Sequence, residues 1–563
     1  MSLNLSVRCL DCGSEFVFNL SATACSTCGS QWLQANYDYK VLGFTLPSNL
    51  SRRQFNLWRY KELLPVDQFD QNLFLGEGGT PLVQASNLGM MLGLNHVYIK
   101  DERQGPTASF KDRQAAVNIA ALKEAEISEM VLASTGNVAI AYSAYAVRAG
   151  IKLWVFLTSL VPEEKMREVA LYGTQVVKVT GTYDQAKQVA VAFARERSLY
   201  LERGARSIPS VEAMKTIAFE IAEQLTEWLG HPAQKNTAGR PEIQWRSPDW
   251  YIQAVSGGLG PLGVQKGFRE LYQMGLVDCI PAIACIQTEG CAPMVNAWRQ
   301  NRNEAQAISS PRTHITTLST GDPGRTYSLL YESAKTHGGV FESVGDEETF
   351  RALHILAKME GLSVEPAAAV AFAGLIKLAR AGLVKPDDVV VVNCSGHTMP
   401  IEKMILGDGG ARDLSTTSYS MKETPVEGLL AALSELSAER FPRVAIVDDN
   451  PDARRLIRRI LQARDNFTLY EAESGRAAIE LANREKLDLV ILDLMMPEVD
   501  GFSVLNALKE NPNTAPIPVI VVTAKELTQE EKRSLHGQIH ALMQKGEFLS
   551  DELLEEVRNV VKT

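Results

Sequence analysis

Lys111 stands between a short turn, residues 106–110, and a helical pattern that begins Lys111-Asp112-Arg113-Gln114. We expect Ser109 or Thr107 to cap the free N–H groups of this helix. A lysine in the first turn of a helix feels the positive end of the helix dipole, which disfavours its charged form. Where burial adds to that effect, more of the amine is neutral, and a neutral amine attacks carbonyl groups. A solvated surface lysine is the alternative that this stretch by itself leaves open.

Polar or glycine-rich loops come directly after three apolar, strand-like runs. These loops are Ser134-Thr135-Gly136-Asn137, Gly257-Gly258-Leu259-Gly260 and Ser395-Gly396-His397. Glycines let backbone N–H groups approach an anion, and a helix that starts behind the loop adds its dipole. A glycine-rich turn alone is often only a tight loop. Together, however, a lysine, an anion site, an amide and a hydroxyl are the groups that pyridoxal phosphate uses.

The elements that must hold these groups alternate between apolar strands and helical patterns over residues 41–406. Strand-like runs occur at residues 131–133, 153–157, 176–179 and 389–392. Continuous apolar strands separated by helices predict buried, largely parallel sheets in an α/β fold. Ligands of such folds bind at the carboxyl ends of the strands, which is where the three loops fall.

Four cysteines near the N-terminus have metal-ligand spacing. They form two C-x-x-C pairs, Cys9 with Cys12 and Cys25 with Cys28, and a glycine follows each pair. Two such turns point four thiolates at one ion, so we expect a structural Zn²⁺ in a ribbon that spans residues 1–40. Redox-active or empty pairs are the alternative. The other four cysteines lack this spacing and are expected in the core: Cys279, Cys285, Cys291 and Cys394.

The order and wording of these motifs resemble the fold-type II pyridoxal-phosphate enzymes, and among them the threonine synthases. The matching segments are Gly76-Glu77-Gly78-Gly79-Thr80-Pro81-Leu82, Lys100-Asp101-Glu102, Pro106-Thr107, Ser109-Phe110-Lys111-Asp112-Arg113, Ser134-Thr135-Gly136-Asn137, Lys215-Thr216, Gly257-Gly258-Leu259-Gly260 and Ser395-Gly396-His397. Many threonine synthases also carry an N-terminal zinc ribbon, so the resemblance covers about residues 1–405. It implies a two-lobed enzyme core like that of the tryptophan synthase β subunit.

The resemblance also assigns roles to individual residues. It makes Lys111 the Schiff-base lysine and proton shuttle, and it directs Asn137 to the phenolic oxygen of the cofactor. Backbone N–H groups of Gly257, Gly258, Leu259 and Gly260 would hold the phosphate, and Ser395 would face the pyridine nitrogen. Ser134, Thr135 and Gly136 would bind substrate. A neutral hydroxyl at the pyridine nitrogen suits β- and γ-eliminations or replacements.

The implied reaction is that of a threonine synthase-like lyase, which converts O-phosphohomoserine and water to threonine and phosphate. The substrate loops nevertheless differ from the family at Ala108, Gln114, Val138, Ala141 and the segment Thr398-Met399-Pro400. Losing polar contacts to a charged substrate changes specificity by orders of magnitude. The alternatives are therefore a cysteate synthase-like or serine/threonine dehydratase-like activity, or an amino-acid sensor with low turnover.

A second α/β pattern starts near residue 441, after a Gly-, Ser- and Thr-rich linker at residues 407–440 that includes a short amphipathic pattern at 426–433. Its apolar runs at residues 444–447, 489–492 and 518–522 end at Asp448-Asp449, at Asp493 and at Thr523. Carboxylates that converge at strand ends repel one another, and their oxygens favour the binding of Mg²⁺. A nearby hydroxyl and Lys545 could hold a phosphoryl group on one of them.

Residues 443–563 resemble the receiver domain of response regulators, most closely at Asp493-Leu494-Met495-Met496-Pro497. The resemblance implies a flavodoxin-like fold with Asp493 as phosphoacceptor. Asp448, Asp449, Asp493 and the carbonyl of Met495 would bind Mg²⁺, while Thr523 and Lys545 would form the switch. A histidine kinase or another phosphodonor would be the partner. Lys545 is followed by Gly546 rather than the usual proline, and no aromatic residue lies in residues 541–544.

Length and charge limit the number of domains and the class of protein. The chain has 563 residues, so we expect several domains: 1–40, 41–406, 407–440 and 441–563. A net charge of −10 argues against a general nucleic-acid binder. No apolar run is long enough to span a membrane and no signal peptide is evident, so we expect a cytoplasmic protein. Resemblance to fold-type II enzymes favours a homodimer.

Overall fold

The computed structural model of the chain describes residues 5–134, 136–158, 161–180, 182–232, 245–397, 442–462, 467–525, 527–535, 537–545 and 550–561. Several expectations lie outside these residues: the role of Thr135, the linker with its short helix, the segment 398–400 and Gly546. In the part of the chain that is described, no helix combines the length and apolar character needed to cross a membrane.

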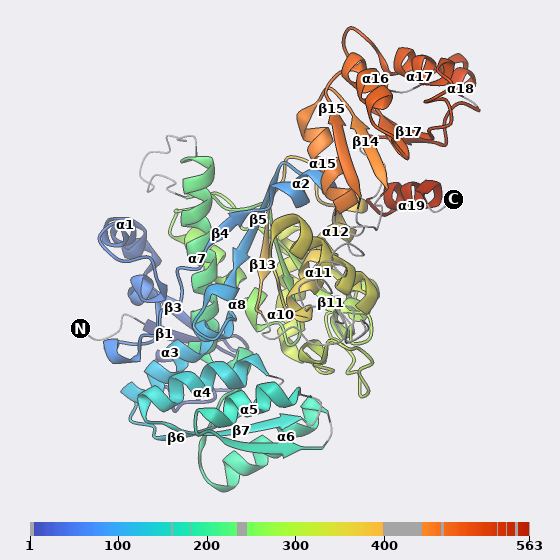
Figure 1. The fold of residues 1–563 in the computed structure, drawn as a ribbon. Helices are drawn as coiled ribbons and strands as arrows, with labels where there is room; N and C mark the ends of the chain where they lie inside the picture. The colour runs from blue at the N-terminus through green and yellow to red at the C-terminus, as the bar shows by residue number, and fades with distance from the viewer. Residues whose placement is uncertain are drawn as a thin grey trace, which may run out of the picture. The chain divides into compact units, whose positions relative to one another are not determined.

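The N-terminal ribbon is an antiparallel sheet of three strands in the order β2-β1-β3. Figure 1 labels two of them, β1 and β3, near the N-terminus. The strands are β1 (Leu5–Cys9), β2 (Glu15–Val17) and β3 (Leu33–Tyr37). Gly13 and Gly29 follow the two cysteine pairs with φ of 73° and 75°, the left-handed conformation expected from the sequence. Leu5 and Val7 of β1 share a core with Phe219 and Phe268 of the enzyme region, so the ribbon packs directly against that region.

The enzyme region alternates strands and helices as predicted. Its strands are β4 (Leu82–Gln84), β5 (His96–Asp101), β6 (Glu129–Ser134), β7 (Lys152–Thr158), β8 (Gln175–Val179), β9 (Tyr200–Leu201), β10 (Trp250–Ala254), β11 (Ala282–Thr288), β12 (Val340–Val344) and β13 (Val389–Cys394). Its helices are α1 (Tyr39–Leu50), α2 (Ser86–Leu92), α3 (Lys111–Glu124), α4 (Asn137–Ala149), α5 (Glu163–Leu171), α6 (Tyr183–Glu196), α7 (Ile208–Leu229), α8 (Leu259–Gln273), α9 (Pro293–Arg299), α10 (Arg325–His337), α11 (Asp346–Glu360) and α12 (Pro366–Arg380).

The smaller sheet of this region has four parallel strands in the order β8-β7-β6-β9. Alternate side chains point to opposite faces of a strand. Leu132 and Val155 accordingly join the core beneath α3 and α4, while Val131 and Phe156 join a separate core beneath α6. Both faces are therefore covered, as the apolar runs at these strands predict.

The larger sheet has six strands in the order β12-β11-β10-β13-β5-β4, all parallel except the β4–β5 pair. α12 packs on β10, β11 and β13. Residues of α7, α8 and α10 share one core with the sheet residues Tyr98 and Tyr251. This arrangement brings the carboxyl ends of β10 and β13 together, each followed by one of the predicted loops.

The C-terminal region forms its own parallel sheet, in the order β15-β14-β16-β17-β18. Its elements are β14 (Arg443–Val447), α15 (Pro451–Gln462), β15 (Thr468–Ala472), α16 (Gly475–Arg484), β16 (Leu489–Leu492), α17 (Gly501–Glu510), β17 (Val519–Thr523), α18 (Gln529–Leu535), β18 (Ala541–Gln544) and α19 (Ser550–Val561). The strand order places β14 and β16 at the centre, so Asp448 and Asp493 leave neighbouring strands at the same edge.

Two local expectations are wrong. No side chain caps α3, because Phe110 occupies the N-cap position and Thr107 instead pairs with the carboxylate of Asp112. Cys279 is exposed in the connection between α8 and β11, whereas the other three cysteines outside the ribbon are buried as expected.

Candidate active site

Lys111 begins α3, and the residues before it are tied to the chain that follows β13. Phe110 donates its N–H to the carbonyl of Ser395 at 3.0 Å, and the N–H of His397 donates to the carbonyl of Ala108 at 2.9 Å. Ala108 has a φ of 55°, an uncommon conformation for a residue with a Cβ. These contacts place Lys111 beside Ser395 although 284 residues separate them in the sequence (395 − 111).

The environment of Lys111 favours its neutral amine. Burial lowers the pKa of Lys111 to about 8, while the carboxylates of Glu202 and Glu365 oppose part of that shift. The Lys111 amine also lies 4.2 Å from the centroid of the Phe110 ring. With this pKa a minor fraction of the Lys111 amine is neutral near physiological pH, but that fraction far exceeds that of an ordinary lysine, and the neutral amine is the form that attacks a carbonyl. The Lys111 side chain is half-buried, which disfavours the alternative of a fully solvated surface lysine.

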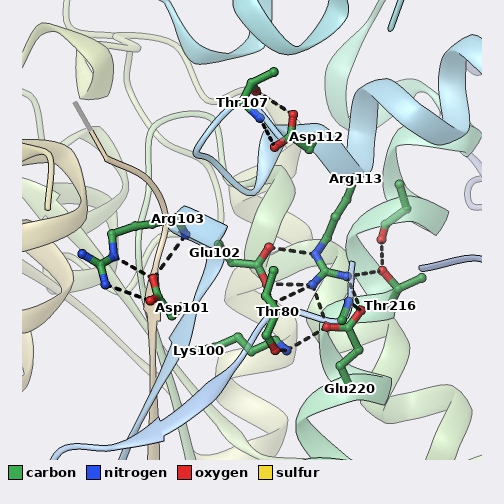
Figure 2. Close-up of polar contacts among 12 residues, drawn as sticks. Thr80, Lys100, Asp101, Glu102, Arg103, Thr107, Asp112, Arg113, Thr216 and Glu220 are labelled. Atoms are coloured by element: carbon green, nitrogen blue, oxygen red, sulfur yellow. Dashed lines mark hydrogen bonds and ion pairs between the residues drawn. The ribbon is translucent and has the colours of Figure 1, made fainter. Parts of the chain in front are cut away.

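Asp112 fixes the turn that precedes Lys111. Its carboxylate accepts hydrogen bonds from the N–H of Thr107 at 2.9 Å and from the Thr107 hydroxyl at 2.6 Å, as Figure 2 shows. A Cβ on Gly105 would lie 2.4 Å from Asp112 Oδ2, so glycine leaves the room that this carboxylate occupies. Burial raises the pKa of Asp112 to about 7.

A buried network of ion pairs around Arg113 also holds the start of α3 (Figure 2). Arg113 donates to Glu102 at 2.8 Å and to Glu220 at 2.7 Å, and Lys100 pairs with Glu220 at 2.7 Å. The network thus joins β5, α3 and α7. Burial would raise the pKa of Glu220, but Arg113 and Lys100 outweigh it and hold that pKa at about 2. Charges buried this deeply must stay paired, so the network fixes the start of α3.

Asn137 is the first residue of α4, and two charged side chains hold its amide. Asn137 Nδ2 donates to Glu365 Oε1 at 2.8 Å, and Lys165 Nζ donates to Asn137 Oδ1 at 3.0 Å. Lys165 Nζ also lies 3.4 Å from Glu365 Oε2. A Cβ at Gly136 would come within 3.0 Å of Lys165 Cδ, so glycine at this position makes room for the lysine.

Ser134 stabilises the loop in front of α4. Its hydroxyl accepts hydrogen bonds from the N–H groups of Gly136 and Ala139, at 3.0 and 3.1 Å. Asn137 begins α4 and therefore lies at the positive end of a helix. The loop can therefore receive the carboxylate of a small molecule.

The glycine-rich loop joins β10 to α8 and requires glycine at two positions, 258 and 260. Gly258 has a φ of 86°, and a Cβ there would lie 2.8 Å from Leu330 Cδ1. A Cβ on Gly260 would lie 2.4 Å from the amide nitrogen of Gln253. Glycine thus permits both the left-handed turn and the close packing, and α8 starts immediately behind with its free N–H groups.

One pocket of about 530 Å³ collects these groups. It is lined by most of the side chains and loops that the sequence singled out, namely Lys111, Ser134, Asn137, Gly257, Gly258, Leu259, Gly260 and Ser395. Gln114 and Val138, at positions where the substrate loops depart from the family pattern, also line it, whereas Gly136 does not. Tertiary packing therefore brings four separate sequence motifs into a single cavity.

Lys165 and Glu365 are site residues that the sequence analysis missed. Both are buried, at 8% and 3% exposure, and both contact Asn137. Glu365 precedes Pro366, the first residue of α12, and Lys165 lies in the first turn of α5. A charged residue among the small apolar residues at 364–373 is a signal that could have identified Glu365, whereas Lys165 lies in an ordinary amphipathic pattern.

The four N-terminal cysteines converge as predicted. Their sulfurs all lie within 4.8 Å of one another, with Cys9 Sγ 3.5 Å from Cys28 Sγ and Cys12 Sγ 3.6 Å from Cys25 Sγ. Each pair is closed by turns in which the N–H groups of Gly13 and Gly29 donate to the carbonyls of Cys9 and Cys25. Four thiolates at these spacings are compatible with a tetrahedral Zn²⁺ site.

The C-terminal sheet brings its predicted residues together as well. Asp448, Asp449 and Asp493 offer carboxylate oxygens within 4.8 Å of one another. Lys545 Nζ lies 2.6 Å from both Asp448 Oδ2 and Asp493 Oδ2. Although burial opposes the shift, these two carboxylates raise the pKa of Lys545, and burial raises the pKa of Asp448.

The remaining predicted residues of that site are close by. Met495 donates its N–H to Asp493 Oδ1 at 3.2 Å, and its side chain is exposed. Thr523 is buried at the end of β17, and its carbonyl accepts the N–H of Lys545 at 2.7 Å. The acidic cluster, the hydroxyl and the lysine thus lie at one edge of one sheet.

Comparisons with known proteins cover both regions. A family model described as "Pyridoxal-phosphate dependent enzyme" matches residues 73–396, and one described as "Response regulator receiver domain" matches residues 444–558. The threonine synthase of Methanocaldococcus jannaschii is 33% identical over 392 residues, which make up 69% of this chain and 91% of that protein. The threonine synthase of Methanosarcina acetivorans is 31% identical over 394 residues, or 70% and 91% of the two chains.

A solved structure is also similar. The processed form of threonine deaminase isoform 2 from Solanum lycopersicum aligns with a TM-score of 0.47 and 20% identity, over 58% of this chain and 81% of that one. The first family match spans every pocket residue from Lys111 to Ser395.

Proposed function

Because the chain belongs to the pyridoxal-phosphate-dependent enzyme family, and its relatives include threonine synthases, we propose that it converts O-phosphohomoserine and water to threonine and phosphate. The observation that carries the proposal is the single pocket that collects Lys111, Asn137, the glycine-rich loop and Ser395. Identity of about a third across 91% of a threonine synthase favours this reaction within the family.

The pocket fits pyridoxal phosphate. The Lys111 amine, whose pKa is lowered, would react with the aldehyde of the cofactor. The loop at residues 257–260 leads into the start of α8, where the backbone N–H groups would bind the phosphate. Gly257 lines the pocket with open space where a Cβ would stand, so a phosphate can approach the backbone there. In the proposed complex Asn137 donates to the phenolic oxygen and Ser395 faces the pyridine nitrogen.

The cofactor supplies, when bound, an electron-withdrawing system that stabilises negative charge on the substrate carbon next to the amine. Lys111 acts as the base that removes the α-proton and later returns a proton, because its amine lines the pocket and is readily neutral. Phosphate leaves from the γ-carbon and water adds at the β-carbon, so the atoms of the two substrates equal those of the two products.

The loop before α4 is proposed to hold the substrate carboxylate. Ser134 and Asn137 line the pocket at the N-terminus of that helix. Backbone N–H groups and the helix dipole there favour an anion. Because Gly136 has no side chain, the loop can lie close to the Lys165 side chain.

The test is a direct assay with the purified, cofactor-loaded full-length protein. Release of phosphate and formation of threonine from O-phosphohomoserine are expected, and Lys111→Ala should abolish both. A protein that leaves O-phosphohomoserine intact but converts serine or threonine to a keto acid and ammonia would be a dehydratase, and the proposal would be rejected.

Two metal ions belong to the proposal. Cys9, Cys12, Cys25 and Cys28 would hold a structural Zn²⁺, supported by the distances between their sulfurs. Asp448, Asp449, Asp493 and the carbonyl of Met495 would hold Mg²⁺ in the receiver domain. Asp493 would accept a phosphoryl group from a histidine kinase or another phosphodonor.

Phosphorylation of Asp493 is proposed to regulate the enzyme. The observation that supports it is the fusion of a receiver domain, with its acid cluster and Lys545 in place, to the enzyme region in one chain. A phosphoryl group at Asp493 would compete with Asp448 for the Lys545 amine and would accept a hydrogen bond from the Thr523 hydroxyl. Both changes would alter the surface of the C-terminal sheet at this edge. If treatment with a phosphodonor and the Asp493→Asn substitution both leave turnover unchanged, the coupling is disproved.

A further inference from the structure

Three arginines line the same pocket as Lys111 without a role in the chemistry described so far. They are Arg203 and Arg206, on the segment between β9 and α7, and Arg325 at the start of α10. With Lys111 and Lys187, the lining has five basic side chains against three acidic ones, Glu202, Asp322 and Glu365. All three of those acids already accept hydrogen bonds: Glu202 from the Gly204 N–H at 2.9 Å, Asp322 from the Gly324 N–H at 2.9 Å and Glu365 from Asn137 at 2.8 Å.

Each of the three arginines is held from the ribbon. Arg203 donates to the carbonyl of Thr23 at 2.9 Å, and Arg206 donates to Gln31 Oε1 at 2.7 Å. Arg325 forms an ion pair with Asp11. The side chains that form one wall of the pocket are therefore oriented by a separate small sheet.

The ribbon also supplies part of the wall itself. Trp32 lines the pocket, and the Arg325 guanidinium lies 5.7 Å from the centroid of its ring. A guanidinium over an indole keeps its charge and its N–H edge available to an anion while the ring restricts its position.

The ribbon residues that make these contacts all flank the cysteines. Asp11 lies between Cys9 and Cys12, Thr23 lies two residues before Cys25, and Gln31 and Trp32 follow Cys28. Ribbons this small have little core of their own, so an ion bound by the four thiolates would fix the loops that carry the contacts. Zinc occupancy and the position of the arginines are thereby linked.

One arginine has an unmet hydrogen bond. Arg203 Nε is buried, and among the described residues it has no acceptor. Burial and the neighbouring Arg206 both act to lower the pKa of Arg203, with burial the larger effect. A buried N–H donor without an acceptor costs free energy unless a ligand supplies one, and an anion in the pocket would do so.

We propose that the ribbon and the enzyme region together build a subsite for the acidic group on the substrate side chain, in which Arg203, Arg206 and Arg325 bind the anion and the ribbon holds them in place. This inference rests on the proposed function, because it assumes an amino-acid substrate whose leaving group is acidic. It identifies the ribbon as a part of the active site whose zinc sets substrate affinity, and not only as a stabilising appendage.

Inorganic phosphate is the probe, titrated by calorimetry into full-length protein saturated with pyridoxal phosphate so that the cofactor's own phosphate site is filled. Arg206→Gln and Arg325→Gln should each raise the Kd for phosphate by about tenfold, since each removes a charge-assisted hydrogen bond. Arg299→Gln is the matched control, because Arg299 is an exposed arginine paired with Glu342 outside the pocket, and its Kd should equal that of the wild type. An unchanged Kd in both pocket variants overturns the subsite.

The ribbon is tested by Gln31→Ala, Trp32→Ala and Cys28→Ser, with zinc content and the absorbance of the bound cofactor measured alongside. Loss of zinc in Cys28→Ser should weaken phosphate binding while the cofactor absorbance stays that of the wild type. If Cys28→Ser does not fold, Gln31→Ala and Trp32→Ala test whether the ribbon supports phosphate binding, because neither residue is a metal ligand. Wild-type phosphate affinity in both of these, or in a folded, zinc-free Cys28→Ser protein, overturns the role of the ribbon.

The phosphate titration needs no turnover, so its outcome is separable from that of the proposed function. Arginine-dependent phosphate binding in a protein that leaves O-phosphohomoserine intact would reject the proposed reaction and keep the subsite. Turnover of O-phosphohomoserine with the same KM in wild type, Arg206→Gln and Arg325→Gln would keep the proposed reaction and reject the subsite.

Discussion

Asn137 Nδ2 lies 2.8 Å from Glu365 Oε1, and this contact joins the first residue of α4 to the residue that precedes α12. Lys165 completes the arrangement by donating to Asn137 Oδ1 at 3.0 Å. Both ends of the Asn137 amide are therefore fixed by charged neighbours, which sets the orientation in which it presents its second N–H. A side chain held in this way is ready to bind without reorganising.

Glu365→Gln should loosen this orientation. The substitution keeps the size of the side chain but removes the charge that pairs with the buried Lys165 amine. We expect the affinity for pyridoxal phosphate to fall about tenfold, which corresponds to about 1.4 kcal/mol. Equilibrium titration of the cofactor-free protein measures it. Glu347→Gln, at a glutamate with an 89% exposed side chain, should bind the cofactor as the wild type does, and equal affinities for both variants would contradict the role given to Glu365.

Cofactor uptake should depend on pH through Lys111. Burial lowers the pKa of Lys111 to about 8, so the neutral, reactive amine increases as the pH rises through that value. The rate at which cofactor-free protein forms its bound-cofactor absorbance should therefore rise between about pH 7 and pH 9 and then level off. Stopped-flow absorbance would show this profile. A rate that keeps rising towards pH 10.5, the ordinary value for lysine, would show that Lys111 is not desolvated.

Arg113→Met should destabilise the protein strongly. It would leave Glu102 and Glu220 buried with fewer partners, and breaking a buried pair on one side costs about 3–5 kcal/mol. Urea unfolding followed by fluorescence measures the loss. Arg299→Gln removes a partly exposed pair and should cost at most about 1 kcal/mol. Similar losses for the two variants would show that the network in Figure 2 contributes no more than a surface ion pair.

Phosphorylation of the receiver domain should require Mg²⁺ and both central carboxylates. Asp448 and Asp493 lie close enough to share an ion, and a bound cation would offset their repulsion as a phosphoryl group arrives. With a small-molecule phosphodonor and Mg²⁺, the wild type and Asp452→Asn, an exposed carboxylate outside the cluster, should gain a phosphoryl group. Asp493→Asn, Asp448→Asn and wild type without Mg²⁺ should gain none. Mass spectrometry of the intact protein reports the outcome for all five samples, and labelling of Asp493→Asn would place the phosphoacceptor elsewhere.

Local sequence was enough to predict much of this protein. Apolar runs predicted strands such as β7 and β13, because a continuous run buried on both faces is characteristic of a parallel strand. Glycine positions such as Gly258 followed from the left-handed backbone that a tight turn at a strand end needs. The C-x-x-C spacing predicted that the four thiols meet, since each pair is closed by its own short turn. These are short-range constraints that a few neighbouring residues satisfy.

Tertiary structure decided which distant side chains meet. Lys165 and Glu365 reach Asn137 only because α5, α4 and α12 pack around one pocket, and no local pattern encodes that packing. Ser109 and Thr107 looked like helix caps, but the N-cap position of α3 is taken by Phe110, which has no side-chain oxygen to accept an N–H, and the Thr107 hydroxyl donates to the buried Asp112 carboxylate. The link from the ribbon to Arg203, Arg206 and Arg325 likewise spans separate domains. The sequence by itself determined the strands, the turns and the reactive residue types, while long-range packing decided their partners, because burial and electrostatic pairing depend on neighbours that the chain brings together only when it folds.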